Sequence, residues 1–304
     1  MAVSYLQPKE YVRAIPLNAA GSSASESLDY TRWLATHHYE NFHVVSFLLP
    51  QRLHQDFFNV YSFCRWADDL GDEIGDTSES LRLLSWWRAE LEAMYRGQTS
   101  HPVFVALAGT VARHDIPIEP FERLIRAFEQ DQAVTRYANF EELFGYCVNS
   151  ANPVGHLVLY LCGYRDAERQ ALSDFTCTGL QLANFWQDIS VDLAKNRVYL
   201  PLNLLDKHGY TVDKLFEGTE DEQFRAVMRE AVGAAEDLFR KGIPLIRKLD
   251  RRLALDIDLF SRGGMKILEK IRDQNYNVLR RRPHISKAER VLLLIRCLPR
   301  LLQP

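Results

Sequence analysis

Helical periodicity runs through almost all of this 304-residue chain and limits the folds it can adopt. From about residue 28 onward, apolar residues recur at spacings of three and four, as in helices with one buried face. Alternation of β-branched residues never persists for six residues, and no Asn-Gly hairpin turn occurs. We expect helices over 28–40, 50–73, 77–95, 101–114, 119–131, 139–163, 166–193, 201–206, 219–252, 254–274 and 286–298. The predicted fold class is therefore all-α.

The breaks between these helices are too poor in Gly, Ser and Pro to act as domain linkers. We expect one helical domain over residues 28–304. Residues 1–27 contain Pro8, Pro16 and a Ser-rich stretch, so we expect an N-terminal extension with no fixed role in the core.

The composition is typical of a soluble globular protein, with a net charge of −3 and 47% hydrophobic residues. The five cysteines form no Cys-x-x-Cys and no Cys/His metal spacing, so they are interpreted as reduced core residues. The N-terminus lacks the basic start and apolar run of a signal peptide, and no stretch is long and apolar enough to span a bilayer. We expect a cytoplasmic protein without a nucleic-acid partner.

Two pairs of aspartates carry the strongest chemical signal. Asp68 and Asp72 are four residues apart, as are Asp188 and Asp192, so on a helix each pair projects from one face. Like charges at this spacing weaken a helix, and a cation bound between them reverses the effect. Carboxylate oxygens suit Mg²⁺, which usually completes its octahedron with water and substrate phosphates. We expect the two pairs to be metal ligands that grip a diphosphate through more than one Mg²⁺ ion.

A single Asp-x-x-x-Asp is also common on solvated helix faces. The neighbours favour a ligand site, because both pairs lie in apolar segments and burying unpaired carboxylates is unfavourable. These neighbours are Phe57, Phe58, Val60, Phe63 and Trp66 at the first pair, and Leu180, Leu182, Ala183, Phe185, Trp186, Ile189 and Val191 at the second.

Residues close to each pair suggest further contacts. Arg65 lies three residues before Asp68, so on a helix it shares that face and can contact a carboxylate or a phosphate. Gly71 costs about 1 kcal/mol relative to Ala inside a helix, which indicates a close backbone approach or a helix end. Arg197 and Tyr199 follow the second pair and are placed to reach back to the diphosphate. Tyr199 fits a partly buried core aromatic equally well.

A proline interrupts the apolar helical stretch around residue 150. Pro153 lacks an amide donor and displaces the carbonyl of Asn149, which predicts a kink. Asn149 and Asn152 supply polar groups beside it. We expect Tyr146, Asn149, Asn152 and Pro153 to line a ligand cavity at this kink. The alternative is a kink that serves packing alone.

With these motifs in this order, the chain resembles the squalene/phytoene synthase family of trans-isoprenoid head-to-head synthases over about residues 28–275. The resemblance implies a single-domain isoprenoid synthase fold, a helical bundle around a central cavity with two Asp-rich motifs binding Mg²⁺ on opposite walls. It places the four aspartates and Tyr146 among the catalytic residues, and Asn184 among the substrate contacts. The segments that carry it are Phe63-Cys64-Arg65 before Asp68 and Asp72, Tyr146-Cys147 with Val154-Gly155, Gln181-Leu182-Ala183-Asn184 before Asp188 and Asp192, and Arg197-Val198-Tyr199-Leu200-Pro201.

Three departures from the general family pattern indicate a branch. Gln187 stands where most members carry Arg, and Ser150-Ala151-Asn152-Pro153 replaces the usual Val-Ala-Gly-x. His38-Tyr39-Glu40-Asn41-Phe42 replaces a Ser/Lys-Phe-Tyr element. Together they resemble the bacterial hydroxysqualene synthases of hopanoid biosynthesis, which ionise presqualene diphosphate and capture the rearranged cation with water. They imply that Tyr39, Asn41 and Gln187 contact substrate, and they argue against phytoene synthesis and a full two-step squalene synthase.

The resemblance therefore implies a Mg²⁺-dependent carbon–oxygen lyase that converts presqualene diphosphate and water to hydroxysqualene and diphosphate. Water capture needs no hydride donor, so NADPH is not expected. One alternative is a prenyltransferase that condenses two farnesyl diphosphates to presqualene diphosphate or squalene. Another is a non-catalytic helical assembly factor of the same fold, which the four intact aspartates disfavour. Coupling to other enzymes of the hopanoid pathway is compatible with this assignment.

Positive charge is concentrated at the C-terminus. Residues 240–304 hold 17 Lys and Arg against 6 Asp and Glu, so they carry about +11. Residues 291–302 are apolar but too short and interrupted to span a bilayer. They fit either a basic amphipathic tail at an anionic membrane surface or leucines packed back onto the helical body.

Overall fold

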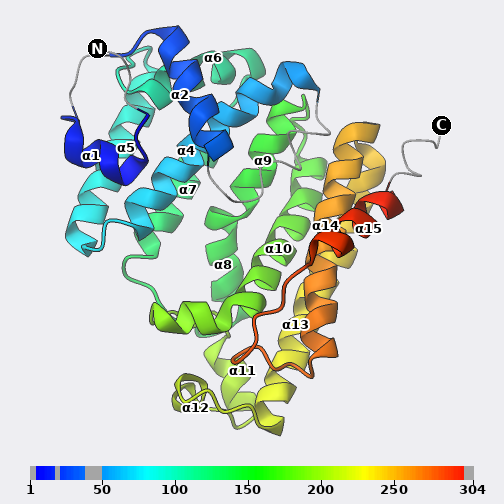
Figure 1. Cartoon of the computed structure of the whole chain (residues 1–304). Helices are drawn as coiled ribbons and strands as arrows, with labels where there is room; N and C mark the ends of the chain where they lie inside the picture. The colour runs from blue at the N-terminus through cyan, green and yellow to red at the C-terminus, as the bar shows by residue number, and fades with distance from the viewer. Residues whose placement is uncertain (1–4, 18–20, 38–49, 298–304) are drawn as a thin grey trace. The chain divides into compact units, whose positions relative to one another are not determined.

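The computed structural model describes residues 5–17, 21–37 and 50–297, and within these ranges every regular element is a helix (Figure 1). The only strand-like contact there is an isolated bridge between Arg136 and Val198. The predicted all-α class is confirmed. The helices are α1 (Pro8–Ala14), α2 (Ala24–His37), η1 (Gln51–Leu53), α4 (His54–Asp72), α5 (Thr77–Tyr95), α6 (Pro102–His114), α7 (Glu119–Gln130), α8 (Phe140–Ser150), α9 (Asn152–Leu161), α10 (Ala167–Ala194), α11 (Leu202–Lys207), α12 (Val212–Phe216), α13 (Glu222–Gly242), η2 (Ile243–Lys248), α14 (Arg251–Asp273) and α15 (Lys287–Cys297).

The chain divides into two compact units, each with its own core. The first contains the residues up to 133 together with 156–165, and the second contains 134–155 and the residues from 166 onward. Helix α9 begins in the second unit and continues in the first. The Asp68 motif belongs to the first unit and the Asp188 motif to the second.

Helix α4 is the central element of the first unit, where it packs against α2, α5, α6 and α7. The indole rings of Trp66 and Trp87 stack at 5.0 Å with only 8° between their planes. The buried Asn59 accepts a hydrogen bond from Thr31 Oγ1 at 2.6 Å and donates to Thr110 Oγ1 at 3.0 Å. Because these bonds join α4 to both α2 and α6, they fix the register of the helix that carries the first aspartate pair.

Helix α1 corrects the expectation that the N-terminal extension has no role in the core. A capping box between Gln7 and Glu10 starts this short helix, and Tyr11 is only 8% exposed. The Tyr11 ring meets the edge of Trp66 at 5.2 Å and that of His101 at 5.1 Å. One short helix with one buried aromatic gives too weak a periodic signal to be recognised in the sequence.

His101 is buried in the same aromatic cluster. Its Nδ1 accepts a hydrogen bond from the amide of Val103 at the start of α6. Burial among these rings lowers the pKa of His101 to about 3, because the charged form loses its hydration.

Helix α10 forms the spine of the second unit, where it packs along α13 and α14. Close packing in this unit depends on glycine where α9 meets α10. A Cβ at Gly155 would lie 2.3 Å from Ser173 Oγ and 2.6 Å from Cys177 Sγ. The match of Val154-Gly155 to the family pattern thus has a packing reason.

Asp256 is a buried carboxylate in α14 of the second unit. It is 2% exposed, and neither carboxylate oxygen has a hydrogen-bond partner. Burial raises the pKa of Asp256 to about 8, with a smaller contribution from the negative charge of Asp250.

The helix limits differ from the sequence prediction where prolines and caps intervene. The helix predicted over 139–163 breaks at Ala151 into α8 and α9, as expected from Pro153. The one predicted over 219–252 becomes α13, the 3₁₀ turn η2 and the start of α14. Asp250 caps α14 by accepting from the amides of Arg252 and Leu253. The five-residue helix α12 was not predicted.

All five cysteines are free and at least partly buried, as expected of core residues. Within the ranges that the structure describes, no helix combines the length and apolar character needed to cross a bilayer.

Candidate functional site

The first aspartate pair lies at the C-terminal end of α4, where Asp72 is the last helical residue. Arg65 contacts Asp68 through Nη1, at 3.1 Å from Oδ2, and contacts Asp69 through Nη2. The expected contact of Arg65 with a carboxylate is confirmed. Asp69, four residues after Arg65, is a second partner that was not predicted although the helical spacing allows it. Asp69 is buried, and its pKa is raised to about 6 by loss of hydration despite the opposing effect of Arg65. The single guanidinium of Arg65 offsets part of the negative charge of these two aspartates.

Gly71 marks a close approach of α7 to this site, and α4 ends one residue later. A Cβ at Gly71 would lie 3.3 Å from the Phe128 side chain, and Gln132 Nε2 donates to the Gly71 carbonyl at 2.9 Å. Both explanations of the glycine, a close approach and a helix end, are confirmed.

The second pair lies near the C-terminal end of α10. Asp188 accepts two hydrogen bonds from Arg282, from Nε to Oδ1 and from Nη2 to Oδ2, the latter at 2.9 Å. This fork-shaped ion pair joins residues 94 positions apart, so local spacing in the sequence carried no sign of it. The adjacent Gln187 donates from Nε2 to the Pro283 carbonyl at 2.7 Å. Asn184, another predicted substrate contact, is exposed on the same helix.

The turn that ends α10 places Arg197 beside Asp192. The amide of Arg197 donates to the Asp192 carbonyl at 2.8 Å, and the amide of Asn196 donates to the Leu193 carbonyl at 2.9 Å. Asn196 has a φ of 55°, in the left-handed region that asparagine tolerates. This is a Schellman motif, and its 6→1 bond fixes the backbone of Arg197 against the last turn of α10.

The chain after α10 then runs beside residues 135–138, joined to them by the isolated bridge and by further backbone hydrogen bonds. The amide of Val198 donates to the Thr135 carbonyl at 2.9 Å, and the amide of Leu202 donates to the Tyr137 carbonyl at 2.9 Å. Arg136 Nη2 donates to Asn196 Oδ1 at 2.8 Å. These bonds bring the Tyr137 ring next to the Tyr199 ring.

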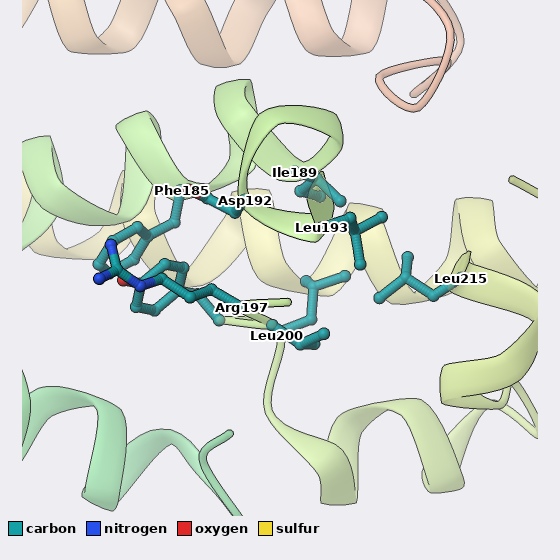
Figure 2. A pocket seen from close by; sticks show the side chains of 9 residues that line it. Phe185, Ile189, Asp192, Leu193, Arg197, Leu200 and Leu215 are labelled. Carbon is teal, nitrogen blue, oxygen red and sulfur yellow. The ribbon is translucent and has the colours of Figure 1, made fainter. Parts of the chain in front are cut away.

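A small pocket lies between the end of α10 and the segment 197–200 that follows it (Figure 2). Figure 2 shows the acidic side chain of Asp192 and the guanidinium of Arg197 among apolar neighbours. The predicted residues Asp192, Arg197 and Tyr199 are therefore brought together. The full lining is Phe185, Ile189, Asp192, Leu193, Arg197, Val198, Tyr199, Leu200 and Leu215.

Four aromatic rings form a continuous cluster at this pocket. Phe185 and Tyr199 stack at 3.7 Å with 6° between their planes, and Tyr146 lies 6.2 Å from Phe185. Tyr137 lies 5.5 Å from Tyr146 and 5.9 Å from Tyr199. Sequence reasoning selected Tyr146 and Tyr199 but missed the other two. Phe185 could have been found, because it lies one turn before Asp188 on the same helix. The position of Tyr137 depends instead on the bridge between residues 136 and 198.

The residues predicted to line a cavity at the break between α8 and α9 lie in different surroundings from one another. Tyr146 is 5% exposed and belongs to the aromatic cluster. Asn152 is also buried, and its Oδ1 accepts a hydrogen bond from Thr178 Oγ1 of α10 at 2.9 Å. Asn149 is half-buried. The two other predicted substrate contacts, Tyr39 and Asn41, lie outside the described residues.

The donor chemistry of both aspartate pairs fits Mg²⁺. Within the described ranges, no three acidic, His or Cys side chains already form a metal cluster. Each pair nevertheless lies at the negative end of a helix dipole, where acidic side chains are unfavourable and cations are favoured. Two carboxylates per motif leave coordination positions for water and phosphate oxygens, as Mg²⁺ prefers.

Comparison with known proteins agrees with the resemblance of the motifs. The family model for squalene/phytoene synthase matches residues 35–289. The phytoene synthase of Thermus thermophilus is 34% identical over 84% of this chain and 87% of its own length. The 15-cis-phytoene synthase of Synechococcus elongatus is 28% identical over 87% of this chain and 90% of its own.

Solved structures show the same fold. The squalene synthase HpnC from Alicyclobacillus acidocaldarius is 42% identical with a TM-score of 0.80, over 84% of this chain and 96% of its own. A dehydrosqualene synthase in complex with ligand is 22% identical with a TM-score of 0.82, over 91% of this chain and 97% of its own.

Proposed function

Because this chain belongs to the squalene/phytoene synthase family, we propose that it converts presqualene diphosphate and water to hydroxysqualene and diphosphate. The observation that carries the proposal is the cluster of four aromatic rings, two of which, Phe185 and Tyr199, line one pocket with Asp192 and Arg197. Such a site combines groups for a departing diphosphate with ring faces that stabilise a cation. The 42% identity to a squalene synthase favours the squalene branch.

The reaction divides into ionisation, rearrangement and capture. The C–O bond to the diphosphate breaks, and its electron pair leaves with the diphosphate. Arg197, held by the turn after α10, supplies positive charge for this leaving group. Asp68, Asp72, Asp188 and Asp192 are the residues that would hold Mg²⁺, which neutralises the leaving diphosphate when bound.

The aromatic cluster serves the second stage. The cyclopropylcarbinyl cation rearranges beside the faces of Tyr146, Phe185 and Tyr199, which favour positive charge without supplying a nucleophilic carboxylate. A lone pair of water then forms the new C–O bond, and the water proton passes to the diphosphate or to solvent. No reductant takes part in this sequence, which is why NADPH is not required.

Gln187 bears on the choice of branch. Where most family members carry Arg, this chain has an amide that donates to the Pro283 carbonyl at 2.7 Å. A positive charge is therefore absent from this position, which suits an enzyme that processes one diphosphate rather than condensing two. The competing activities are condensation of two farnesyl diphosphates, and phytoene synthesis as in the relative that is 34% identical.

Product analysis separates these activities. The protein is incubated with Mg²⁺ and either presqualene, farnesyl or geranylgeranyl diphosphate, with and without NADPH, and the products are identified by mass spectrometry. Hydroxysqualene from presqualene diphosphate, carrying oxygen from ¹⁸O-labelled water and independent of NADPH, is expected. Squalene or presqualene diphosphate from farnesyl diphosphate, or a C40 product, would identify a prenyltransferase instead. No turnover of any substrate would favour an assembly factor.

A pair of substitutions tests the role of the rings. Tyr199→Phe keeps the aromatic face and removes the hydroxyl, whereas Tyr199→Leu removes the face. We expect the rate to be retained within a few-fold in the first variant and to fall by about tenfold or more in the second, as one cation–π contact is worth about 1–2 kcal/mol. Equal losses in both variants would mean that the hydroxyl, not the ring, is what matters.

The second part of the proposal concerns a membrane surface. On α15, Val291, Leu292 and Ile295 are exposed, and with Ala288 they form an apolar stripe at helical spacing. In helical projection, exposed Lys287 and Arg296 flank this stripe on its two sides. Leu292 faces outward, as a membrane-facing tail requires. Leu293 and Leu294 are partly buried, as expected of leucines packed back onto the helical body.

An apolar stripe bordered by cations suits the headgroup region of an anionic bilayer. Long-chain isoprenoid substrates and products partition into lipid, so docking there would place the enzyme at its substrate.

Liposome co-sedimentation tests this docking. Binding should increase with anionic lipid, weaken with salt, and drop on removal of residues 288–304. The double substitution of Val291 and Ile295 by Ser should weaken binding, whereas Ile243→Ser, at an equally exposed isoleucine outside α15, should not. Binding unaffected by the truncation would leave α15 as an ordinary part of the fold.

A further inference from the structure

The segment between α14 and α15 is fastened to α10 by two adjacent residues. Arg282 forms the fork-shaped ion pair with Asp188, and the next residue, Pro283, accepts a hydrogen bond from Gln187 at 2.7 Å. Pro283 is buried at this contact, whereas Arg281 and Arg282 are exposed. Within the segment, the side chain of Gln274 donates from Nε2 to the Arg281 carbonyl at 2.9 Å.

Both carboxylate oxygens of Asp188 are engaged in this arrangement. A divalent metal bound by Asp188 needs at least one of these oxygens and repels a guanidinium placed against the same group. The guanidinium and the metal are both cations, so either of them relieves the repulsion among the acidic side chains at this end of α10. The Arg282 guanidinium and a metal ion therefore compete for the carboxylate of Asp188.

We propose that Arg282 is a positioning residue that occupies Asp188 in the metal-free protein and is displaced when metal binds, releasing residues 280–286 from α10. The inference rests on the proposed metal-binding role of Asp188. It adds that metal affinity is set by competition with a named side chain, and that metal occupancy is reported by a segment of the chain.

The release is confined to this segment. Helix α15 keeps its own attachment to α14, because Lys270 pairs with Glu289 at 2.8 Å and Cys297 is buried. Amide exchange should therefore change between α14 and α15 but not within them.

Metal binding measured without turnover tests the competition. Mn²⁺ is used as the probe and its binding is followed by electron paramagnetic resonance, alone and with inorganic diphosphate. Arg282→Gln should bind Mn²⁺ about three- to tenfold more tightly than the wild type, since exposed and half-exposed ion pairs of this kind are worth a factor of that order. Arg282→Lys, which keeps the charge but loses the fork, should lie between the two.

Arg281→Gln is the matched control. It removes the same charge from the residue that precedes Arg282 in the same segment. It therefore measures the general electrostatic effect of losing one cation near the site. A gain in affinity that is equal in Arg281→Gln and Arg282→Gln would overturn the proposal, because it would show no specific competition.

Hydrogen exchange supplies an independent measurement. In the wild type, exchange in residues 280–286 should increase on addition of Mn²⁺ with diphosphate. In Asp188→Asn it should already be high without metal, because the amide cannot form the charged pair. Unchanged protection of this segment in both cases would overturn the inference. Absence of Mn²⁺ binding in every variant would instead contradict the proposed function itself.

Discussion

Replacement of Asp256 by Asn should make the stability of the second unit less sensitive to pH. The carboxyl group is 2% exposed and neither oxygen has a hydrogen-bond partner, so its charged form loses nearly all of its hydration. Its pKa is raised from 3.8 to about 8 in the folded protein. Between these two values the folded chain holds a proton that the unfolded chain releases.

The sign and size of the effect follow from proton linkage. A group whose pKa is raised on folding contributes stability that is complete below its unfolded pKa and is lost as the pH rises to its folded pKa. Each pKa unit corresponds to about 1.4 kcal/mol, so Asp256 should remove on the order of 5 kcal/mol between about pH 4 and pH 8. The asparagine of the variant would not titrate, and its neutral amide has nearly the size of the protonated acid.

Exchange protection of α14 amides measures the stability of this unit directly, without requiring the whole chain to unfold in one step. We expect wild type and Asp256→Asn to agree within about 1 kcal/mol near pH 4 and to diverge by several kcal/mol near pH 8, with the variant more stable. Each protein at low pH serves as its own control for packing changes. Parallel stability curves across this range would refute the reasoning, because they would show that Asp256 titrates normally or is paired with a cation.

The remaining predictions concern the proposed metal ligands, the packing of α9 and the buried histidine. Asp68→Asn and Asp188→Asn should each lower turnover with Mg²⁺ by about 10²-fold or more, as measured by product formation, and near-normal rates in both would contradict the metal role. Gly155→Ala should lower the free energy of unfolding by about 1–3 kcal/mol because its methyl group has no space, whereas Gly233→Ala, with nothing within 4 Å, should be neutral or slightly stabilising in the same denaturation assay. The lowered pKa of His101 should reduce stability as the pH falls from about 6.5 toward 3, and His101→Asn, which keeps a capping side chain, should flatten that limb of the pH–stability curve.

Local patterns in the sequence were sufficient for the fold class and for contacts within a turn or two of helix. The spacing of Arg65 and Asp68 predicted an ion pair that the structure contains, because both residues lie on one helix. Pro153 likewise predicted the break between α8 and α9, since the cause is a missing amide at that position.

Contacts between distant segments could not be predicted in the same way. The pairing of Arg282 with Asp188 and the position of Tyr137 at the aromatic cluster depend on how loops return to α10. No periodicity in the sequence encodes these returns. The burial of Asp69 was missed for a related reason, because a run of acidic residues does not show which member faces the core.

The turn at Asn196 is an adjustable link between Asp192 and Arg197. Asn196 is exposed, yet its left-handed backbone sets the path from Asp192 to Arg197. Glycine could take this conformation at no steric penalty, whereas a β-branched residue would resist it and shift the guanidinium. Evolution or protein engineering can therefore alter the distance between Asp192 and Arg197 by changing a solvent-facing residue, while both of these side chains stay the same.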